Sequence, residues 1–297
     1  MKYVITGGAG HISKPIVEKL LANGHIVTVI GRNADKLKEL TDKGATAAIG
    51  SLDDVKFLTD VFEGANAVYT MVPPNMDAAN WKEWIGQIGV YYAQAIKNAG
   101  IRYVVNLSSV GAHLPDGVGP VSGLYKAEQA LNALKDVNVI HLRPSYFFNN
   151  LLANTGMVKH MNIIGNNFGG EDFKMVLTDP SDIAEAAAEE LLKLNFSGNT
   201  FRYIASDERN INEVAKVLGT AVGKPELPWV VFTNEQAYEG MVNAGLPKEI
   251  AKNYEEMGNA LQTGKMTEDY WKNHPSKLGK VKLENFAKTF AAIYNSN

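Results

Sequence analysis

The sequence predicts an α/β fold built around a doubly wound parallel sheet. Throughout the first 150 residues, short apolar runs alternate with segments of helical periodicity. Each apolar run is nearly uninterrupted, which is typical of strands buried on both faces of a parallel sheet. Strands joined in this way by helices form right-handed crossovers, so the helices cover both faces of a single sheet.

Six apolar runs are the predicted strands of this sheet, at residues 3–6, 26–30, 46–49, 67–72, 103–107 and 137–142. The first crossover helix is indicated by Ile16 and Leu20, which recur at helical spacing before Gly24. Glycine suits the end of a helix because it tolerates a left-handed backbone. The same periodicity predicts a helix over residues 55–62 and a longer one over residues 81–96.

The alternation stops after Pro144. Residues 151–176 are rich in glycine and asparagine, and we expect them to form an irregular loop. A helix should begin at residues 179–182, with Asp179 or Ser181 as its cap, and run to Leu194. Residues 201–204 should then return to the sheet as a late strand.

From residue 210 onward the pattern is mainly helical. A length of 297 residues is enough for about two domains. We therefore expect residues 1–150, with residues 177–205 returning to them, to form the sheet domain. Residues 151–176 and 206–297 should form a smaller, mainly helical lobe on the substrate side.

Composition excludes several classes of protein. The chain is 45% hydrophobic and its formal net charge is −3, which argues against a protein that neutralises many nucleic-acid phosphates. It contains no cysteine, which excludes disulfides, thiolate nucleophiles and cysteine zinc clusters. Its histidines lack clustered carboxylates, so no metal site is expected.

No apolar run approaches the roughly 18 residues that a membrane span requires. The first strand runs directly into a glycine loop, which leaves no room for a signal peptide. We therefore expect a cytoplasmic protein that binds neither membranes nor nucleic acid and is a monomer or a homodimer.

The segment from Thr6 to Ser13 lies between the first predicted strand and the first predicted helix. Its spacing is Gly7-x-x-Gly10-x-x-Ser13, with serine at the third glycine position of a Rossmann-type dinucleotide loop. Glycines allow close approach of the backbone to a pyrophosphate, and the helix N-terminus favours negative charge. This loop predicts a bound dinucleotide; a glycine-rich turn without a ligand is the alternative.

The end of the second strand indicates which dinucleotide is bound. An NAD site places a carboxylate there, about 20 residues beyond the loop, to hold the ribose hydroxyls. This sequence has Arg32 instead, followed by Lys36. A guanidinium can form two hydrogen bonds with a 2′-phosphate, so NADP(H) is the expected cofactor. The alternative is a solvated surface arginine.

Two serines, Ser108 and Ser109, follow the fifth strand, and the next lysine is Lys126. Short-chain reductases place a proton-donating tyrosine four residues before such a lysine, but this sequence has Ser122 there. Tyr125 is adjacent to the lysine, and neighbours on a helix point about 100° apart. The Tyr-x-x-x-Lys pair is therefore absent, and Lys126 binds the cofactor or is a surface lysine.

The sequence resembles the NmrA-like family of atypical short-chain dehydrogenases/reductases. The resemblance extends over nearly the whole chain and rests on these segments: Thr6-Gly7-Gly8-Ala9-Gly10-His11-Ile12, Gly31-Arg32, Leu107-Ser108-Ser109, Lys126 with Glu128, Leu142-Arg143-Pro144-Ser145-Tyr146-Phe147-Phe148-Asn149-Asn150 and Asp179-Pro180-Ser181-Asp182-Ile183-Ala184. Members include NADPH-dependent quinone and azo- or triarylmethane-dye reductases, and regulators that bind NADP without turnover.

The resemblance implies a set of cofactor-binding residues: Gly7, Gly8, Ala9, Gly10, His11, Ile12, Arg32, Lys36, Ser51, Leu52, Val72, Pro73, Pro74, Ser108, Lys126, Tyr146, Phe147, Phe148 and Asn149. Ser51 departs from the aspartate often found at its position. Lys126 and Tyr146 are the candidates for a catalytic role.

The expected function is NADPH-dependent hydride transfer to a planar, electron-poor small molecule such as a quinone or an azo or triarylmethane dye. Such acceptors delocalise the incoming charge and need no strong proton donor, which fits the missing tyrosine. Tyr146, Phe147 and Phe148 follow a strand end and could stack on a planar acceptor, or belong to the core. The alternative function is an NADP(H)-sensing regulator that acts through a protein partner.

Overall fold

The computed structural model describes residues 1–296 and divides them into two compact units. The first unit comprises residues 1–115, 121–143 and 183–202. The second comprises residues 116–120, 144–182 and the chain from Tyr203 onward. The division into domains drawn from the sequence, as a statement about parts that fold independently, stays a prediction.

The first unit is built on a seven-stranded sheet in the order β10-β6-β5-β4-β1-β2-β3. The strands are β1 (Lys2–Ile5), β2 (Ile26–Gly31), β3 (Thr46–Ile49), β4 (Ala67–Thr70), β5 (Tyr103–Leu107), β6 (Asn138–Pro144) and β10 (Asn199–Ile204). The pairings from β3 across to β6 are parallel. At the edge, Val139 N donates to Gly198 O and Ser145 N donates to Ile204 O, so β10 also runs parallel to β6.

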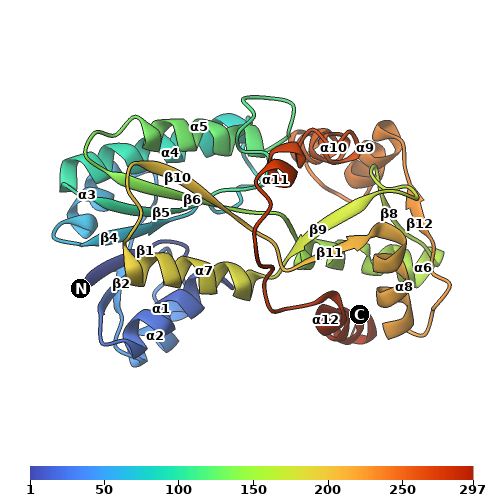
Figure 1. Ribbon diagram of the computed structural model, residues 1–297, viewed down its shortest axis with the longest axis horizontal. Helices are drawn as coiled ribbons and strands as arrows, with labels where there is room; N and C mark the ends of the chain where they lie inside the picture. Colours follow the sequence, from blue (N-terminus) through green and yellow to red (C-terminus); the bar gives the residue numbers. More distant parts are fainter. Residues whose placement is uncertain (297) are drawn as a thin grey trace. The chain divides into compact units, whose positions relative to one another are not determined.

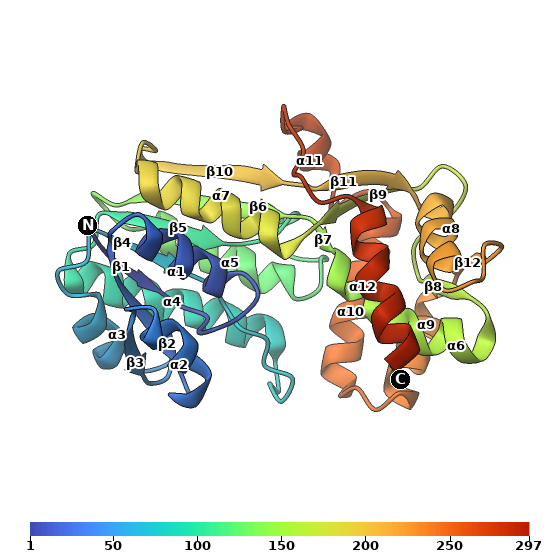
Figure 2. The same cartoon turned by 90° about the horizontal axis from the view of Figure 1, so that it is seen from below.

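Helices cover both faces of this sheet (Figure 1). One face is covered by α3 (Val55–Phe62), α4 (Trp81–Ala99) and α5 (Val121–Asn132). The other is covered by α1 (Ser13–Ala22), α2 (Lys38–Asp42) and α7 (Pro180–Lys193), the side seen in Figure 2. The predicted doubly wound fold is confirmed. The six predicted strands, the helix after Asp179 and the late strand lie where the sequence placed them, within a few residues.

The strands are apolar because both faces are buried. All four residues of β4 are buried, and Val68 lies in one hydrophobic cluster with Ile88 and Ile96 of α4. On the opposite face, the hydroxyl of Tyr3 donates to Leu191 O of α7 at 2.9 Å. Burial of large apolar side chains on both faces is the main source of stability for such a sheet.

Glycines bring α4 and α5 into close contact. A Cβ at Gly86 would lie 2.9 Å from the Cβ of Lys126, and one at Gly89 would lie 2.4 Å from the Cβ of Ala127. A Cβ at Gly123 would lie 2.7 Å from the Cβ of Ile85. These glycines fix the position of α5, which holds several of the candidate site residues.

The second unit contains two small sheets and most of the C-terminal helices. The strands β11 (Asp207–Asn210), β9 (Lys174–Thr178) and β7 (Tyr146–Phe147) form one sheet, and β12 (Trp229–Val231) pairs with β8 (Ile164–Asn166) in the other. The helices are α6 (Thr155–Met161), α8 (Ile211–Ala221), α9 (Asn234–Asn243), α10 (Lys248–Gln262), α11 (Glu268–Lys272) and α12 (Leu283–Ser296), with a 3₁₀ segment, η2 (Phe148–Asn154).

The prediction that residues 151–176 form an irregular loop is wrong, because they contain α6, β8 and most of the length of η2 and β9. The asparagine and glycine content has local causes. Asn162 ends α6 in the left-handed conformation. Gly165 lies in β8, where a Cβ would meet the carbonyl oxygen of Val230 at 2.2 Å. Short strands of this kind are stabilised by partners far along the chain, which local periodicity does not indicate.

Within residues 1–296, no helix combines the length and the apolar character that crossing a bilayer demands.

Candidate functional site

The glycine loop after β1 requires glycine for two different reasons. Gly7 and Gly8 have φ values of +91° and +58°, which side chains rarely adopt. A Cβ at Gly7 would also lie 2.4 Å from the hydroxyl of Ser13. Gly8 N donates to Ile30 O at 3.0 Å, so the loop crosses directly over the end of β2.

Ser13 takes the place of the third glycine at the start of α1. It is 3% exposed, and its hydroxyl donates to Thr6 O at 2.8 Å. The serine therefore ties the start of the helix to the residue that follows β1. No side chain caps α1, and its first turn has no acidic residue, so the helix N-terminus can receive an anion.

Arg32 and Lys36 are both exposed and lie just beyond the end of β2. The turn between them is held by Asn33, whose side-chain oxygen accepts from Asp35 N at 2.8 Å. Lys36 belongs to the short 3₁₀ helix η1 (Asp35–Leu37). Neither cation forms a hydrogen bond or an ion pair with another side chain in the part of the chain that the structure describes. Two unpaired positive charges therefore follow β2, the strand whose end the glycine loop crosses.

The ends of β3 and β4 contribute the next predicted positions. Ser51 is exposed and Leu52 is half-buried after β3. After β4, Met71 N donates to the hydroxyl oxygen of Thr6 at 3.0 Å, which joins this strand end to the start of the glycine loop. Val72, Pro73 and Pro74 follow; the first two are half-buried and the last is exposed.

A buried ionic cluster lies beneath the end of β5. Arg143 of β6 forms two hydrogen bonds with Glu128 of α5, from Nε to Oε1 at 3.0 Å and from an Nη to Oε2 at 2.6 Å. The hydroxyl of Ser108 donates to the same Oε1 at 2.5 Å. All three residues are at most 7% exposed. Glu128 and Arg143 both lie in segments that carry the resemblance to NmrA-like proteins, but the sequence did not predict that they form this cluster.

A second buried chain of hydrogen bonds runs beside the cluster. The hydroxyl of Thr70 donates to Asn106, whose amide nitrogen lies 3.0 Å from Nδ1 of His141. Nε2 of His141 lies 2.9 Å from the side-chain oxygen of Asn132. Burial lowers the pKa of His141. His141 is therefore a buried strand histidine whose two ring nitrogens both have hydrogen-bond partners.

On α5, the predicted lysine is exposed, whereas Ser122 at the tyrosine position is buried. Nζ of Lys126 lies 2.5 Å from a carboxylate oxygen of Glu83, in the first turn of α4. Ser122, four residues earlier, is 1% exposed, and its hydroxyl has no hydrogen-bond partner within residues 1–296. Tyr125 is half-buried.

Residues 146–149 belong to the second unit. Tyr146 and Phe147 are half-buried, and the ring of Tyr146 contacts that of Phe168 edge-to-face at 5.8 Å. Burial raises the pKa of the Tyr146 phenol. Phe148 is fully buried and stacks on Phe286 at 5.2 Å, so its ring belongs to the core of this unit. Asn149 is half-buried.

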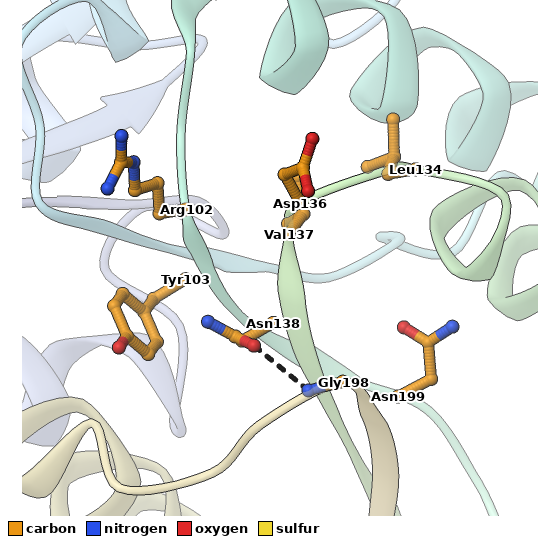
Figure 3. A pocket seen from close by; sticks show the side chains of 8 residues that line it. All are labelled: Arg102, Tyr103, Leu134, Asp136, Val137, Asn138, Gly198 and Asn199. Atoms are coloured by element: carbon orange, nitrogen blue, oxygen red, sulfur yellow. Dashed lines mark hydrogen bonds between the residues drawn. The ribbon is translucent and has the colours of Figure 1, made fainter.

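An open pocket of about 680 Å³ lies where β5, β6 and β10 begin (Figure 3). It is lined by Arg102, Tyr103, Leu134, Asp136, Val137, Asn138, Gly198 and Asn199. These residues precede or begin β5, β6 and β10, whereas the glycine loop follows the end of β1. Ligands of doubly wound sheets bind at the carboxyl ends of the strands, so this pocket is not the predicted cofactor site.

Comparison with known proteins also indicates that this chain binds a nicotinamide dinucleotide. The family model described as NAD(P)H-binding matches residues 7–193. The chain belongs to this NAD(P)H-binding family. The matched residues include the glycine loop, Arg32 and Lys126, and they end with α7.

The NAD(P)H azoreductase of Xenophilus azovorans is 25% identical over 248 residues, which is 84% of this chain and 83% of the azoreductase. Among solved structures, the NADPH-dependent quinone oxidoreductase of Escherichia coli has a TM-score of 0.79 at 18% identity, covering 97% of this chain and 98% of its own. The triphenylmethane reductase of Citrobacter sp., complexed with NADP(H), has a TM-score of 0.79 at 19% identity, covering 98% and 100%. The resemblance to NmrA-like reductases is confirmed.

Proposed function

We propose that this protein is an NADPH-dependent reductase that delivers a hydride to a planar, electron-poor acceptor of the quinone or azo- or triarylmethane-dye type. The observation on which the proposal depends most is the pair of unpaired cations, Arg32 and Lys36, beside a glycine loop that opens onto an uncapped helix N-terminus. Names of the relatives support the acceptor class, since they include an azoreductase, a quinone oxidoreductase and a triphenylmethane reductase.

The residues present fit an NADP dinucleotide. The left-handed backbone at Gly7 and Gly8 leaves room for a pyrophosphate next to the first amides of α1. Arg32 and Lys36 would hold the 2′-phosphate, because a guanidinium can donate two parallel hydrogen bonds to it. When bound, the cofactor supplies the hydride. The chain itself contributes binding, orientation and exclusion of water.

The acceptor class is inferred from the residue that occupies the position of the proton-donating tyrosine of short-chain reductases. Ser122 occupies it and is buried, and a serine hydroxyl is too weak an acid to replace a tyrosine near neutral pH. A simple ketone becomes an alkoxide on reduction and needs a strong proton donor, whereas a quinone or dye delocalises the charge. We therefore assign quinones and dyes, and not ketones, aldehydes or alcohols, as substrates.

Tyr146 is proposed as a ring that stacks on the acceptor, and Lys126 as a contact of the nicotinamide ribose. The resemblance to NmrA-like reductases supports both roles. An aromatic ring can stack on a planar acceptor, and an ammonium group can donate hydrogen bonds to ribose hydroxyls. The remaining predicted cofactor contacts are proposed in the same sense, with two exceptions. The hydroxyl of Ser108 is already donated to Glu128, and the ring of Phe148 belongs to the core.

The experiment is anaerobic NADPH oxidation with a panel of 1,4-benzoquinone, a naphthoquinone and an azo dye, beside simple ketones and aldehydes. Calorimetric affinities for NADP⁺ and NADPH are measured on the same preparation. We expect turnover with the quinones or the dye and none with the carbonyl compounds. The Arg32→Asp variant is the matched control, since it should lower NADPH-dependent turnover without changing the acceptor preference.

Failure of every quinone and dye, combined with micromolar binding of NADP(H), would reject the reductase proposal. That result would favour the alternative, in which occupancy by NADP(H) controls binding of a protein partner. Rapid reduction of ketones would contradict both functions, because neither provides the required proton donor.

A further inference from the structure

The two serines at the end of β5 have very different surroundings. Ser108 is 5% exposed and its only hydroxyl proton is donated to Glu128. Ser109 is half-buried, and among the described residues its hydroxyl has no hydrogen-bond partner. The sequence prediction names Ser108 as a cofactor contact, but the structure leaves only the hydroxyl of Ser109 without a hydrogen-bond partner among the described residues.

The hydroxyl of Ser108 is held by the strongest polar interactions in its neighbourhood. A hydrogen bond to a carboxylate is about twice as strong as one between neutral groups. Glu128 is itself fixed by two hydrogen bonds from Arg143, whose guanidinium also lies 4.5 Å from the centre of the Phe201 ring. Freeing the proton of Ser108 for a ligand would leave a buried carboxylate with one hydrogen bond fewer, which is costly.

The alternation of side chains explains why Ser109 is free. Val104 lies in the cluster with α4, Asn106 is linked through His141 to α5, and Ser108 bonds to Glu128 of α5. Residues of a strand point alternately to opposite faces, and β5 ends at Leu107. Ser108 still continues the series that faces α5, whereas Ser109 is one residue out of step with it and makes no bond to the cluster. Ser109 is therefore placed at the carboxyl edge of the sheet without being drawn into the buried cluster.

The position of β5 in the sheet indicates which part of a dinucleotide lies nearby. The strand order reverses between β1 and β4, and dinucleotides bind across the carboxyl ends at that point. The glycine loop, Arg32 and Lys36 lie at the ends of β1 and β2 and account for the pyrophosphate and the 2′-phosphate. The end of β5 lies in the other half of the sheet, which corresponds to the nicotinamide half of the cofactor.

We propose that Ser109 is the serine that binds the cofactor, through a hydrogen bond between its hydroxyl and the carboxamide of the nicotinamide. A hydroxyl can both donate and accept, as can a carboxamide, so the two groups are complementary. Ser108, Glu128 and Arg143 are positioning residues that hold the end of β5 against α5. The inference rests on the proposed function only in taking NADP(H) as the cofactor, and it requires no turnover.

The test compares Ser109→Ala with Ser108→Ala in calorimetric titrations of the full chain. Two ligands are used: NADP⁺, which has the nicotinamide, and adenosine 2′,5′-bisphosphate, which lacks it. Ser109→Ala should weaken binding of NADP⁺ about 3- to 10-fold, the effect of one hydrogen bond, and leave the bisphosphate unchanged. Ser109→Thr, which keeps the hydroxyl, should bind both ligands like the unmodified protein.

Ser108→Ala should lower the Tm and change the affinities for the two ligands by the same factor. The proposal is overturned if Ser109→Ala binds NADP⁺ with unchanged affinity, or loses affinity for both ligands equally. It is also overturned if Ser108→Ala alone selectively weakens NADP⁺. None of these results depends on quinone reduction, so a protein that binds NADP⁺ in this way but reduces no acceptor would reject the proposed function and retain this inference.

Discussion

The ammonium group of Lys126 lies 2.5 Å from the carboxylate of Glu83. The lysine proposed to bind the nicotinamide ribose therefore already has an anionic partner. Both side chains are about half exposed, at 48% and 60%, and exposed ion pairs contribute at most about 1 kcal/mol. A ligand hydroxyl can displace Glu83 at small cost.

We predict that Lys126→Ala weakens NADPH binding or lowers kcat while the Tm stays within a few degrees of the unmodified protein. Glu83→Gln should have the opposite effect and strengthen NADPH binding by up to about fivefold, since it releases the lysine from a surface pair. Fluorescence titration with NADPH measures both. Tyr125→Phe is the control, because Tyr125 points away from the face that holds Lys126. Unchanged affinity and unchanged turnover in Lys126→Ala would make this lysine a surface residue only.

Arg32 should determine the choice between NADPH and NADH. We predict that NADPH binds at least about tenfold more tightly, a difference of about 1.4 kcal/mol. Arg32→Asp should erase or reverse this preference, because a carboxylate repels the 2′-phosphate and accepts hydrogen bonds from the ribose of NADH. Competitive titration of both cofactors provides the measurement. Since Arg32 is exposed, the preference should also shrink as salt is added. Equal affinities of the unmodified protein for the two cofactors would refute the assignment.

Tyr146→Ala should raise KM for a quinone. A stacked aromatic pair contributes roughly 0.5–1.5 kcal/mol beyond the area that it buries, so the increase should be about two- to tenfold. Tyr146→Phe keeps the ring and should leave KM unchanged. Because burial raises the pKa of the phenol, this side chain stays protonated near neutral pH and should add no pH dependence there. Steady-state kinetics with one quinone at saturating NADPH test all three statements.

His141 should make the protein less stable in mild acid. Burial holds its pKa below the ordinary value of about 6.5, so the unfolded chain binds more protons than the folded chain once the pH falls below that value. The free energy of unfolding should therefore decrease as the pH drops from about 6.5 toward the folded-state pKa, with a slope of at most about 1.4 kcal/mol per pH unit. Urea unfolding at pH 7.5, 6.0 and 5.0 measures it. His141→Gln should reduce the slope, and an unaltered slope in that variant would disprove the assignment.

The fold of the first unit could be predicted from the sequence because its elements are defined by local patterns. β4 and β5 are continuous apolar runs, and the loop at Gly7 and Gly8 has a spacing that few other structures require. The fold of the second unit was harder to predict from the sequence. β8 has three residues and its partner β12 begins at Trp229, so its stability depends on a pairing that no local window contains.

The candidate site likewise has one part that the sequence predicts and one part that it does not. The glycine loop, Arg32 and Lys36 are close in sequence and could be identified together. The cluster of Ser108, Glu128 and Arg143 joins the end of β5 to α5 and β6, and glycines let α5 pack closely on α4. Sequence spacing does not show which of two adjacent serines such a cluster takes up. The structure was needed to distinguish Ser108 from Ser109.

The edge strand β10 and the helix α7 come from residues 180–204, after the chain has left the first unit at residue 143 and built part of the second. During synthesis on the ribosome, the first unit therefore emerges without its last strand and without the helix that accepts the hydrogen bond of Tyr3. Until those residues appear, β6 is an open edge and one sheet face lacks one of its helices, an arrangement prone to aggregation. A nascent chain stalled near residue 143 would accordingly depend on chaperones, whereas one stalled beyond residue 204 would have every strand of the sheet.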